Sequence, residues 1–405
     1  MTSDGTGRGR ARAAAGFFVS PLGIVFTTVV VDLVGFGIVL PILPLWAQRF
    51  GASPVEIGLI TASYAVMQLL FAPVWGRLSD RYGRRPIILI SLAGSAASAL
   101  LIGLAGTLLV IFLARVLQGI AGASYAAAQA YVADVTSPRE RARGMGLIGA
   151  AFGLGFVLGP AMGALFSAVD PRAPFIAAAV LAAANLALAW RRLPESRRPG
   201  AAASTSRAGA LRRALASREV APLVLLSFVA TFAFVGMEAT FALFGDRRFG
   251  YGQVEMGLLF AYIGVASAAA QGGLVGPLVA RAGEARVMVA GLGGTAAGLL
   301  LVAAAESLWL LLVGLAVLAV AAGLVFSTTT ALISLAAGAR DQGAILGVTA
   351  SVGGAARIAG PVVGTVLFQH AGIAVPLLVG AGLFALCALG AVRLAAGPAV
   401  ASPSP

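Results

Sequence analysis

The stretch that decides the fold is Gly76-Arg77-Leu78-Ser79-Asp80-Arg81-Tyr82-Gly83-Arg84-Arg85-Pro86, which places four arginines and one aspartate between two long apolar runs. Glycine adopts backbone dihedrals that other residues avoid, and proline suits the first turn of a helix, so the stretch predicts a tight turn between two helices. So much charge between apolar segments of membrane length predicts a position at a bilayer surface.

The composition of the whole chain is that of an integral membrane protein. Of 405 residues, 60% are hydrophobic and only 11% are charged, and the mean hydropathy is +0.97, whereas about a quarter of the residues of a soluble domain are charged. The formal charge of +13 does not predict nucleic acid binding, because the arginines lie between apolar segments rather than on one polar face. The predicted partner is therefore a lipid bilayer and no nucleic acid.

Twelve segments are long and apolar enough to cross a hydrocarbon core, which takes roughly 20 residues each. The predicted spans are 18–46, 55–76, 86–105, 108–132, 144–168, 174–191, 221–244, 254–278, 286–304, 307–335, 343–369 and 371–394. An Arg-rich stretch separates them into two sets of six. The predicted organisation is a tail over 1–17, a six-helix bundle over 18–191, a linker over 192–219, a second six-helix bundle over 220–395 and a tail over 396–405.

The placement of the arginines predicts the orientation of these spans. With the amino terminus in the cytoplasm, inner segments hold 22 arginines and outer loops hold 4. Cytoplasmic loops of membrane proteins carry such an excess, so both termini and the linker are expected to be cytoplasmic. The two remaining arginines, Arg115 and Arg357, fall inside spans.

The two halves repeat each other at an offset close to 200 residues. Val55-Glu56-Ile57-Gly58 recurs as Val254-Glu255-Met256-Gly257, and Gly159-Pro160-x-x-Gly163 recurs as Gly360-Pro361-x-x-Gly364. The opening stretch recurs too, with Ala280 at the position of Asp80. A transporter built from two parallel repeats is expected to hold its substrate between them, near the bilayer midplane.

The fifth predicted span carries a stripe of glycines at four-residue spacing, Gly155, Gly159 and Gly163, with Pro160 inside it. The spacing places the glycines on one helical face, where a neighbouring helix can approach closely, and the proline is expected to bend the helix. Generic close packing is one interpretation. A role in the transport mechanism is the other.

Several of these motifs resemble those of the major facilitator superfamily. The opening stretch resembles its signature loop between the second and third helices, and twelve helices in two sixes is its layout. Gly149 to Gly163 resembles the fifth-helix motif of its antiporter branch. The first span, Asp32 to Pro44, resembles that of the drug:proton antiporter family with twelve helices, and Arg115-Val-Leu-Gln118-Gly119 matches that family's arginine motif.

Three further segments are similar to the tetracycline efflux group: Tyr131 to Arg143, Leu193-Pro194-Glu195-Ser196, and Phe244 to Phe249. That group uses a histidine in the eighth helix and an acid in the ninth, where this chain has Ser267 and a stretch near Gly293. The resemblance implies an all-α membrane protein with two pseudo-symmetric six-helix bundles. It also implies proton-coupled export in a bacterial inner membrane, with tetracycline itself a doubtful substrate.

Charged side chains in mid-span are candidate functional residues, because burying them costs at least ~2.5–3.5 kcal/mol. Asp32 lies near the middle of the first span and Arg115 in the outer half of the fourth. Burial favours the protonated form of a carboxyl and a nearby arginine favours its charged form, a balance that can bring protonation within physiological pH. We expect Asp32 to be the proton and substrate-cation site. A structural Asp32–Arg115 ion pair is the alternative.

Two more charged residues leave alternatives open. Glu238, in the seventh span, is expected either to bind a cationic substrate or second proton, or to pair with Arg247 or Arg248 near the outer surface. Arg357, in the eleventh span, is expected either to neutralise Glu238 or to select anionic groups on a substrate.

Uncharged residues complete the candidate cavity. They are isolated polar groups and aromatic rings in apolar spans, for which plain interhelical hydrogen bonding is an alternative. These residues are Phe36, Tyr64, Gln68, Gln118, Tyr125, Gln129, Phe234, Tyr262 and Gln271.

Asp80 is an acid inside an arginine cluster, which opposes the topology signal unless the acid has a partner. The eleventh span begins near Gln342, and the free N–H groups of a helix start carry partial positive charge. We expect Asp80 to latch the two halves together on the inner side; a loop that only fixes topology is the alternative. The residues expected in this latch are Gly76, Asp80, Arg81, Gly83, Arg84, Asp134, Arg141 and Arg143.

The sequence predicts no enzyme. With one histidine, His370, and one cysteine, Cys387, it predicts no metal-ligand cluster and no catalytic triad, and without lysine it contains no phosphate loop. Neither a cofactor nor a metal is expected. The predicted function is a monomeric, proton-coupled antiporter that exports hydrophobic or cationic small molecules. A sugar or metabolite transporter of the same fold is the alternative, and a non-transporting receptor is a third reading.

Overall fold

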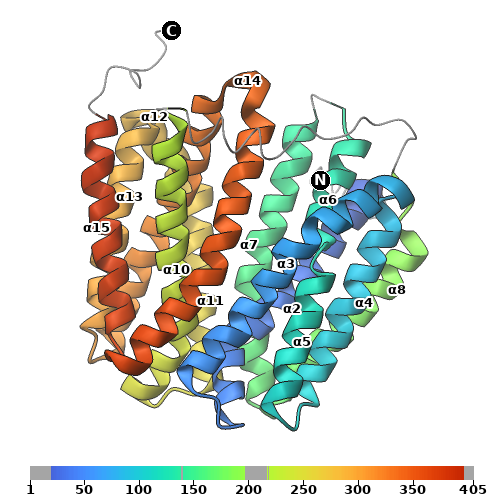
Figure 1. Ribbon diagram of the computed structural model, residues 1–405, viewed down its shortest axis with the longest axis horizontal. Helices are drawn as coiled ribbons and strands as arrows, with labels where there is room; N and C mark the ends of the chain where they lie inside the picture. Colours follow the sequence, from blue (N-terminus) through green and yellow to red (C-terminus); the bar gives the residue numbers. More distant parts are fainter. Residues whose placement is uncertain (1–19, 138–139, 197–216, 218, 396–405) are drawn as a thin grey trace, which may run out of the picture. The chain divides into compact units, whose positions relative to one another are not determined.

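The computed structural model describes residues 20–137, 140–196, 217 and 219–395, and within these ranges the chain forms helices and no strand (Figure 1). In the described part, 12 helical segments are long and apolar enough to cross a membrane, which confirms the predicted number of spans. Most of the predicted linker and nearly all of both predicted tails lie outside the described residues.

Contacts between Cα atoms divide the described chain into two compact units. Residues up to Leu43 and from Leu70 to Ser196 form unit 1, and Pro44–Leu69 and the residues from Ser217 onward form unit 2. The units differ from the predicted six-helix bundles at Pro44–Leu69.

Unit 1 contains most of the first six predicted spans. Its helices are α2 (Pro21–Gln48), α3 (Pro54–Tyr82), α4 (Arg84–Gly103), α5 (Leu108–Ala121), α6 (Ser124–Val135), α7 (Arg141–Ser167) and α8 (Ala173–Arg192), of which α2 and α3 are shared with unit 2.

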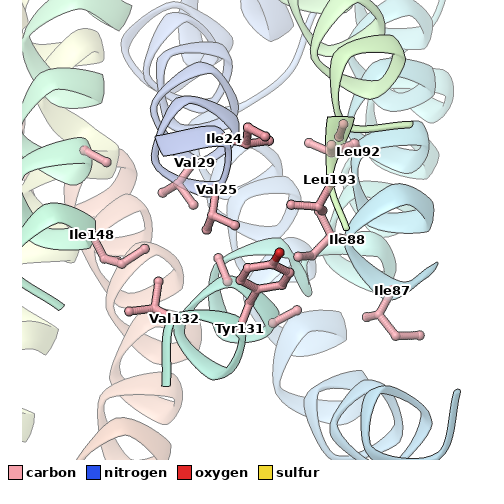
Figure 2. Close-up of a cluster of buried hydrophobic side chains, with 14 of the residues drawn as sticks. Ile24, Val25, Val29, Ile87, Ile88, Leu92, Tyr131, Val132, Ile148 and Leu193 are labelled. Carbon is pink, nitrogen blue, oxygen red and sulfur yellow. The ribbon is translucent and has the colours of Figure 1, made fainter. Parts of the chain in front are cut away.

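The core of unit 1 joins one end of each of its helices α2, α4, α6 and α8. Figure 2 shows the Tyr131 ring of α6 amid aliphatic side chains that include Val25 of α2 and Ile88 of α4. Leu193, just beyond α8, closes this cluster. The end of the sixth span is thereby fixed to α4 and α6.

Unit 2 contains the later spans. Its helices are α10 (Val220–Phe249), α11 (Gln253–Ala269), the π-helical η1 (Ala270–Leu274), α12 (Val275–Ala282), α13 (Glu284–Ala303), α14 (Leu308–His370) and α15 (Val375–Ala395). Helix α13 packs on α14 and α15, and α10 packs on α14 and α15. Figure 1 shows α13 and α15 side by side.

Two helices extend further than predicted, α3 to Tyr82 and its repeat α12 to Ala282. The opening stretch is helical as far as Tyr82, and the turn is made by Gly83 alone, with φ +105° and ψ 166°. Its repeat Gly283 has φ +79° and ψ 157°. Glycine alone adopts this region readily, so one residue suffices to reverse the chain. The label α14 covers two helices, the tenth and eleventh spans, which meet at a kink where Gly338 is not helical, with φ 64° and ψ 160°.

Candidate functional site

Asp32 lies half-buried on the face of α2 that packs in the core of unit 1. Residues three and seven apart share a helical face, so Asp32 lies on the same face as Val29 and Val25. These two valines belong to the cluster that also contains Tyr131 and Val132 of α6. The predicted coupling carboxylate and Arg115 of the fourth span therefore lie in the same unit.

Arg115 is buried on α5 with only 3% of its surface exposed. Its Nη1 donates a hydrogen bond to Oε1 of Gln118, 2.5 Å away and one turn later. Gln118, a predicted cavity residue, is itself 8% exposed and holds the guanidinium in place. The arginine motif is thus a locally ordered pair on one helix.

The fourth span is interrupted directly after this pair, between α5 and α6. Neighbouring helices satisfy the backbone groups that the interruption frees. The Ser91 hydroxyl of α4 donates to the Ala121 carbonyl and accepts from the Ala123 N–H, 3.2 Å away. The Trp75 indole N–H donates to the Ile120 carbonyl. A non-helical backbone is tolerated in a membrane only when such groups are paired.

Glu238 is the second candidate carboxylate and lies in the interior of α10, half-buried. Among the described residues it forms neither an ion pair nor a hydrogen bond. One turn earlier, Phe234 meets the Phe326 ring of α14 edge-on, with ring centroids 5.5 Å apart. A carboxylate beside aromatic rings offers both charge and apolar surface to a lipophilic cation.

The predicted pairing of Glu238 with Arg247 or Arg248 is absent. Arg248 instead binds Glu306 at 3.3 Å through Nη2, and its Nε donates to the Ala305 carbonyl at 3.2 Å. Glu238 lies more than two turns before these arginines on the same helix, so it is directed elsewhere. Nor does Glu238 pair with Arg357.

Arg357 lies where α14 packs against the first half of α3, within unit 2. The Val55 N–H donates to Oε1 of Gln369 at 3.1 Å, and a Cβ on Gly58 would lie 2.9 Å from the Pro361 carbonyl. At the other end, a Cβ on Gly354 would lie 3.2 Å from Leu69. The two helices therefore run antiparallel in close contact.

Two predicted cavity residues of α3 lie at the level of Arg357 in this contact. Gly58 lies opposite Pro361 and Leu69 opposite Gly354 in this antiparallel contact, so Tyr64 of α3 lies at the level of Arg357. Gln68 Nε2 donates a hydrogen bond to the Tyr64 hydroxyl at 3.0 Å. The structure therefore brings together three residues that the sequence analysis selected separately, Tyr64, Gln68 and Arg357.

The predicted latch residues form a network at the start of α4. Arg84 binds Asp80 at 2.7 Å and Asp134 of α6 at 3.0 Å, and its Nη1 donates to the Ser79 hydroxyl at 3.1 Å. Arg81 lies over the Tyr82 ring instead, 5.3 Å from its centroid.

The other latch residues contribute less to this network. Gly83 supplies the turn, and Gly76 borders open space. The Arg141 and Arg143 side chains lie outside the described part of the structure. The predicted link from Asp80 to the eleventh span stays a prediction.

Glu195 joins this network from the end of the sixth span. Its carboxylate accepts the backbone N–H groups of Arg84 at 2.8 Å and Arg85 at 3.2 Å. These are free donors at the first turn of α4, where a negative charge also complements the helix dipole. Arg85 in turn donates to the Trp190 carbonyl at 2.6 Å.

The glycine stripe of α7 packs against α2. A Cβ on Gly159 would lie 2.7 Å from Gly37 backbone atoms, and one on Gly163 would lie 2.8 Å from Ile42. A Cβ on Gly155 would lie 2.5 Å from the Leu33 Cβ, the shortest of the three distances. Pro160 lies within the helix beside this contact. The geometry is that of close helix packing.

The remaining cavity candidates are dispersed. Tyr262 donates to the Leu312 carbonyl of α14 at 3.2 Å, an interhelical hydrogen bond. Gln271 is exposed on η1, and Phe36 and Gln129 are half-buried on α2 and α6. The Tyr125 side chain lies outside the described part of the structure.

Sequence reasoning missed the residues that support these sites. Ser91, Trp75 and Phe326 act through contacts between separate spans, so no local pattern marks them, and the role of Glu195 was also missed. The motif Leu193-Pro194-Glu195-Ser196 was a signal for Glu195, because it places an acid at the end of a span. Within the described residues, no group of three His, Cys, Asp or Glu side chains could hold a metal ion.

Comparisons with known proteins identify the family of the chain. A family model described as Major Facilitator Superfamily matches residues 25–281 and 269–404. The chain is 34% identical over 376 residues to the class C tetracycline resistance protein of Escherichia coli, covering 90% of this chain and 94% of that protein. It is 31% identical over 241 residues to multidrug resistance protein 1 of Bacillus subtilis (strain 168), covering 59% and 61%.

Among solved structures, the chain is similar to the human organic anion transporter MFSD10 (TETRAN), with a TM-score of 0.69 and 27% identity. The match covers 91% of this chain and 98% of that chain.

Proposed function

The chain belongs to the major facilitator superfamily, and from that premise we propose that it exports hydrophobic or cationic small molecules, antibiotics among them, in exchange for protons. The chain is a multi-pass membrane protein. The proposed cycle is alternating access, in which the binding site opens to one side of the membrane at a time. We propose that the protein works as a monomer.

The observation that carries the proposal is Glu238, a carboxylate inside a membrane span with neither an ion pair nor a hydrogen bond among the described residues. An acid inside a membrane span without a protein partner is costly unless it binds a proton or a cation. The adjacent Phe234–Phe326 pair supplies the apolar surface that a lipophilic cation requires.

Asp32 and Arg115 are proposed to couple protons to this export. Asp32 lies on the face of α2 that packs in the core of unit 1, and Arg115 of the same unit is bound by Gln118. Protonation of Asp32 removes a negative charge near this arginine, and deprotonation restores it. Each step changes the charge of the Asp32 carboxylate by one unit. Such a change can favour either the outward-open or the inward-open state of the transporter.

The substrate range is proposed to be broad rather than limited to tetracycline. At the eighth-span position that is histidine in the tetracycline group, Ser267 donates to the Ala319 carbonyl of α14 at 3.3 Å. That side chain therefore serves helix contact. The relatives named above include both tetracycline and multidrug resistance proteins.

The location is proposed to be a bacterial inner membrane with both termini in the cytoplasm. The support is the bias of 22 arginines on one predicted side against 4 on the other, together with the bacterial resistance proteins among the relatives.

The test is export from cells that lack their own efflux pumps. Accumulation of a panel of cationic dyes and antibiotics is measured with and without a protonophore, for the wild type, Asp32→Asn, Glu238→Gln and Glu219→Gln. Glu219 is the matched control, an exposed acid that precedes α10.

Wild-type cells should accumulate less of at least one compound, and the protonophore should abolish that difference. Asp32→Asn and Glu238→Gln should each slow export by about tenfold or more, equivalent to ~1.4 kcal/mol per tenfold, while Glu219→Gln exports as the wild type does. Equal accumulation in expressing and empty cells contradicts export. Uptake of sugars or amino acids in the same cells would instead support the alternative carrier.

A further inference from the structure

Arg357 is an unusual residue because it places a permanent charge deep in a span. Asp341–His370 crosses the membrane as the eleventh span, and Arg357 lies about 20 Å along the helix from either end at 1.5 Å per residue. Such a charge normally faces a cavity or a partner of opposite sign. Yet its guanidinium forms no ion pair or hydrogen bond with the residues that the structure describes.

The packing of α14 shows which way Arg357 points. Gly360 and Gly364 face α10, since a Cβ on either would lie against Gly236. Gly354 faces α3, since a Cβ there would meet Leu69. Arg357 is three residues from both Gly354 and Gly360, so its side chain lies between the α3-facing and the α10-facing directions.

The membrane-facing side of the same helix lies elsewhere. Val363 and Val366 are 40% and 38% exposed. Arg357 and Val366 are separated by about two and a half helical turns, so they point in opposite directions. Arg357 therefore points away from the exposed apolar face, in a direction between α3 and α10, and it is itself exposed rather than enclosed by packing. Its mid-span depth also separates it from lipid headgroups.

The α3 side of Arg357 is polar. Tyr64 lies on α3 at the level of Arg357, given the antiparallel register of the two helices, and Gln68 Nε2 donates a hydrogen bond to the Tyr64 hydroxyl at 3.0 Å. Gly353, one turn before Arg357 on the same helix, leaves room beside the guanidinium, because even an added Cβ there would lie 3.6 Å from Nη1. Among the described residues, the guanidinium therefore has polar groups at its level on α3 and no acid paired with it.

We infer that Arg357, Tyr64 and Gln68 form an anion-binding subsite that recognises the carboxylate of an exported molecule. A guanidinium presents two parallel N–H donors that match the two oxygens of a carboxylate. The bound anion would neutralise the charge that the protein leaves unpaired. This inference rests on the proposed export function and narrows its substrate class to amphiphiles that carry a carboxylate besides their cationic or aromatic part.

The test compares two dyes that differ only at the carboxylate. Rhodamine B carries a free carboxylate, and its ethyl ester does not. Binding of both dyes to purified protein in lipid nanodiscs is measured by fluorescence anisotropy for the wild type, Arg357→Gln, Arg357→Lys and Arg247→Gln. Arg247 is the control, an exposed arginine at the end of α10.

The wild type should prefer the free acid over the ester. Arg357→Gln should reduce that preference by about tenfold, the loss expected for a charge-assisted hydrogen bond. Arg357→Lys should recover part of the preference, and Arg247→Gln should keep all of it. A purely structural arginine would change the affinity for both dyes together.

A wild type that binds the acid no more tightly than the ester overturns the inference, as does an Arg357→Gln variant that keeps the wild-type preference. Export of the ester from cells, measured separately, reports on the proposed function. Ester export without a free-acid preference refutes only the subsite, and a free-acid preference without proton-driven export refutes only the proposed function.

Discussion

Ser91 illustrates at the scale of one residue how a break in a membrane helix is stabilised. Its hydroxyl both donates to the Ala121 carbonyl and accepts from the Ala123 N–H. No water is present in the hydrocarbon core to replace these partners. One side chain on α4 therefore satisfies two backbone groups of the fourth span, close to Arg115 and Gln118.

Replacing Ser91 by alanine is predicted to destabilise the protein. Ser91→Ala removes one of two hydrogen bonds from both the Ala121 carbonyl and the Ala123 N–H, which also bond to each other at 2.7 Å, at a cost of about 0.5–1.5 kcal/mol for each lost bond. The thermal midpoint of the detergent-purified variant should fall by several degrees.

The matched control is Ser98→Ala on the same helix. Ser98 is also buried, but its hydroxyl donates only to the Ser95 carbonyl of its own helix, at 3.0 Å. Its removal should change the midpoint much less. Equal shifts for the two variants would show that Ser91 does not hold the break.

Charged residues were the part of the candidate site that could be selected most readily from the sequence. Asp32, Arg115, Glu238 and Arg357 stand out because charges in apolar spans are rare and costly. Their directions were not predictable, because helices that are apolar nearly all round show no periodic face. The Tyr64–Gln68–Arg357 cluster emerges only from the packing of α3 on α14.

Helix contacts built from glycine dominate at the scale of the elements. In unit 1, Gly159 of α7 meets Gly37 of α2, and in unit 2, Gly360 of α14 meets Gly236 of α10. The four residues occupy corresponding positions of the two repeats, so the duplication seen in the sequence also holds in the packing.

Two substitutions on α7 are predicted to have opposite effects. A Cβ at Gly159 would lie 2.7 Å from backbone atoms of Gly37, which cannot rotate away. Gly159→Ala should therefore destabilise the protein by about 1–3 kcal/mol, the usual cost of overpacking. Gly153 has no neighbouring atom within 4 Å of its added Cβ. Gly153→Ala should be neutral or stabilising by up to ~1 kcal/mol, because alanine favours the helix.

The measurement is the thermal midpoint of both variants in the same detergent. A lower midpoint for Gly159→Ala and an unchanged or higher one for Gly153→Ala are expected. If Gly159→Ala is as stable as the wild type, α7 and α2 do not depend on this close approach.

Helix number was predictable from the sequence, but helix continuity was not. Hydropathy shows which segments are apolar enough to lie in the membrane. The predicted spans therefore agree with the observed ones to within a few residues at most ends. It carries no information on whether the backbone hydrogen bonds continue. The interruption at Gly122, the π-helical turn at Ala270–Leu274 and the helical end of α3 at Tyr82 were therefore missed.

Asp80 bears on the behaviour of the whole molecule. Its ion pair with Arg84 is local, and the Asp80 side chain is 68% exposed. An exposed pair one helical turn apart contributes about 0.3–0.5 kcal/mol at most. That contribution is too small to explain a role in stability.

Asp80→Asn is accordingly predicted to leave expression and the thermal midpoint unchanged while impairing transport, as the proposed latch between the halves requires. Dye export from pump-deficient cells measures the effect. Asp246→Asn, at the far end of α10, is the control acid and should export normally. Normal export by Asp80→Asn would contradict the latch and support the alternative, a loop that only fixes topology.

Proton exchange is the central claim for the molecule as a whole, and everted membrane vesicles test it most directly. A vesicle with an acidic lumen receives a cationic dye outside, while a pH-sensitive fluorophore inside reports proton release. The wild type and the control Asp170→Asn should raise the lumenal pH when dye is added, and Asp32→Asn should not. Dye accumulation by the wild type without any change in lumenal pH would contradict the account.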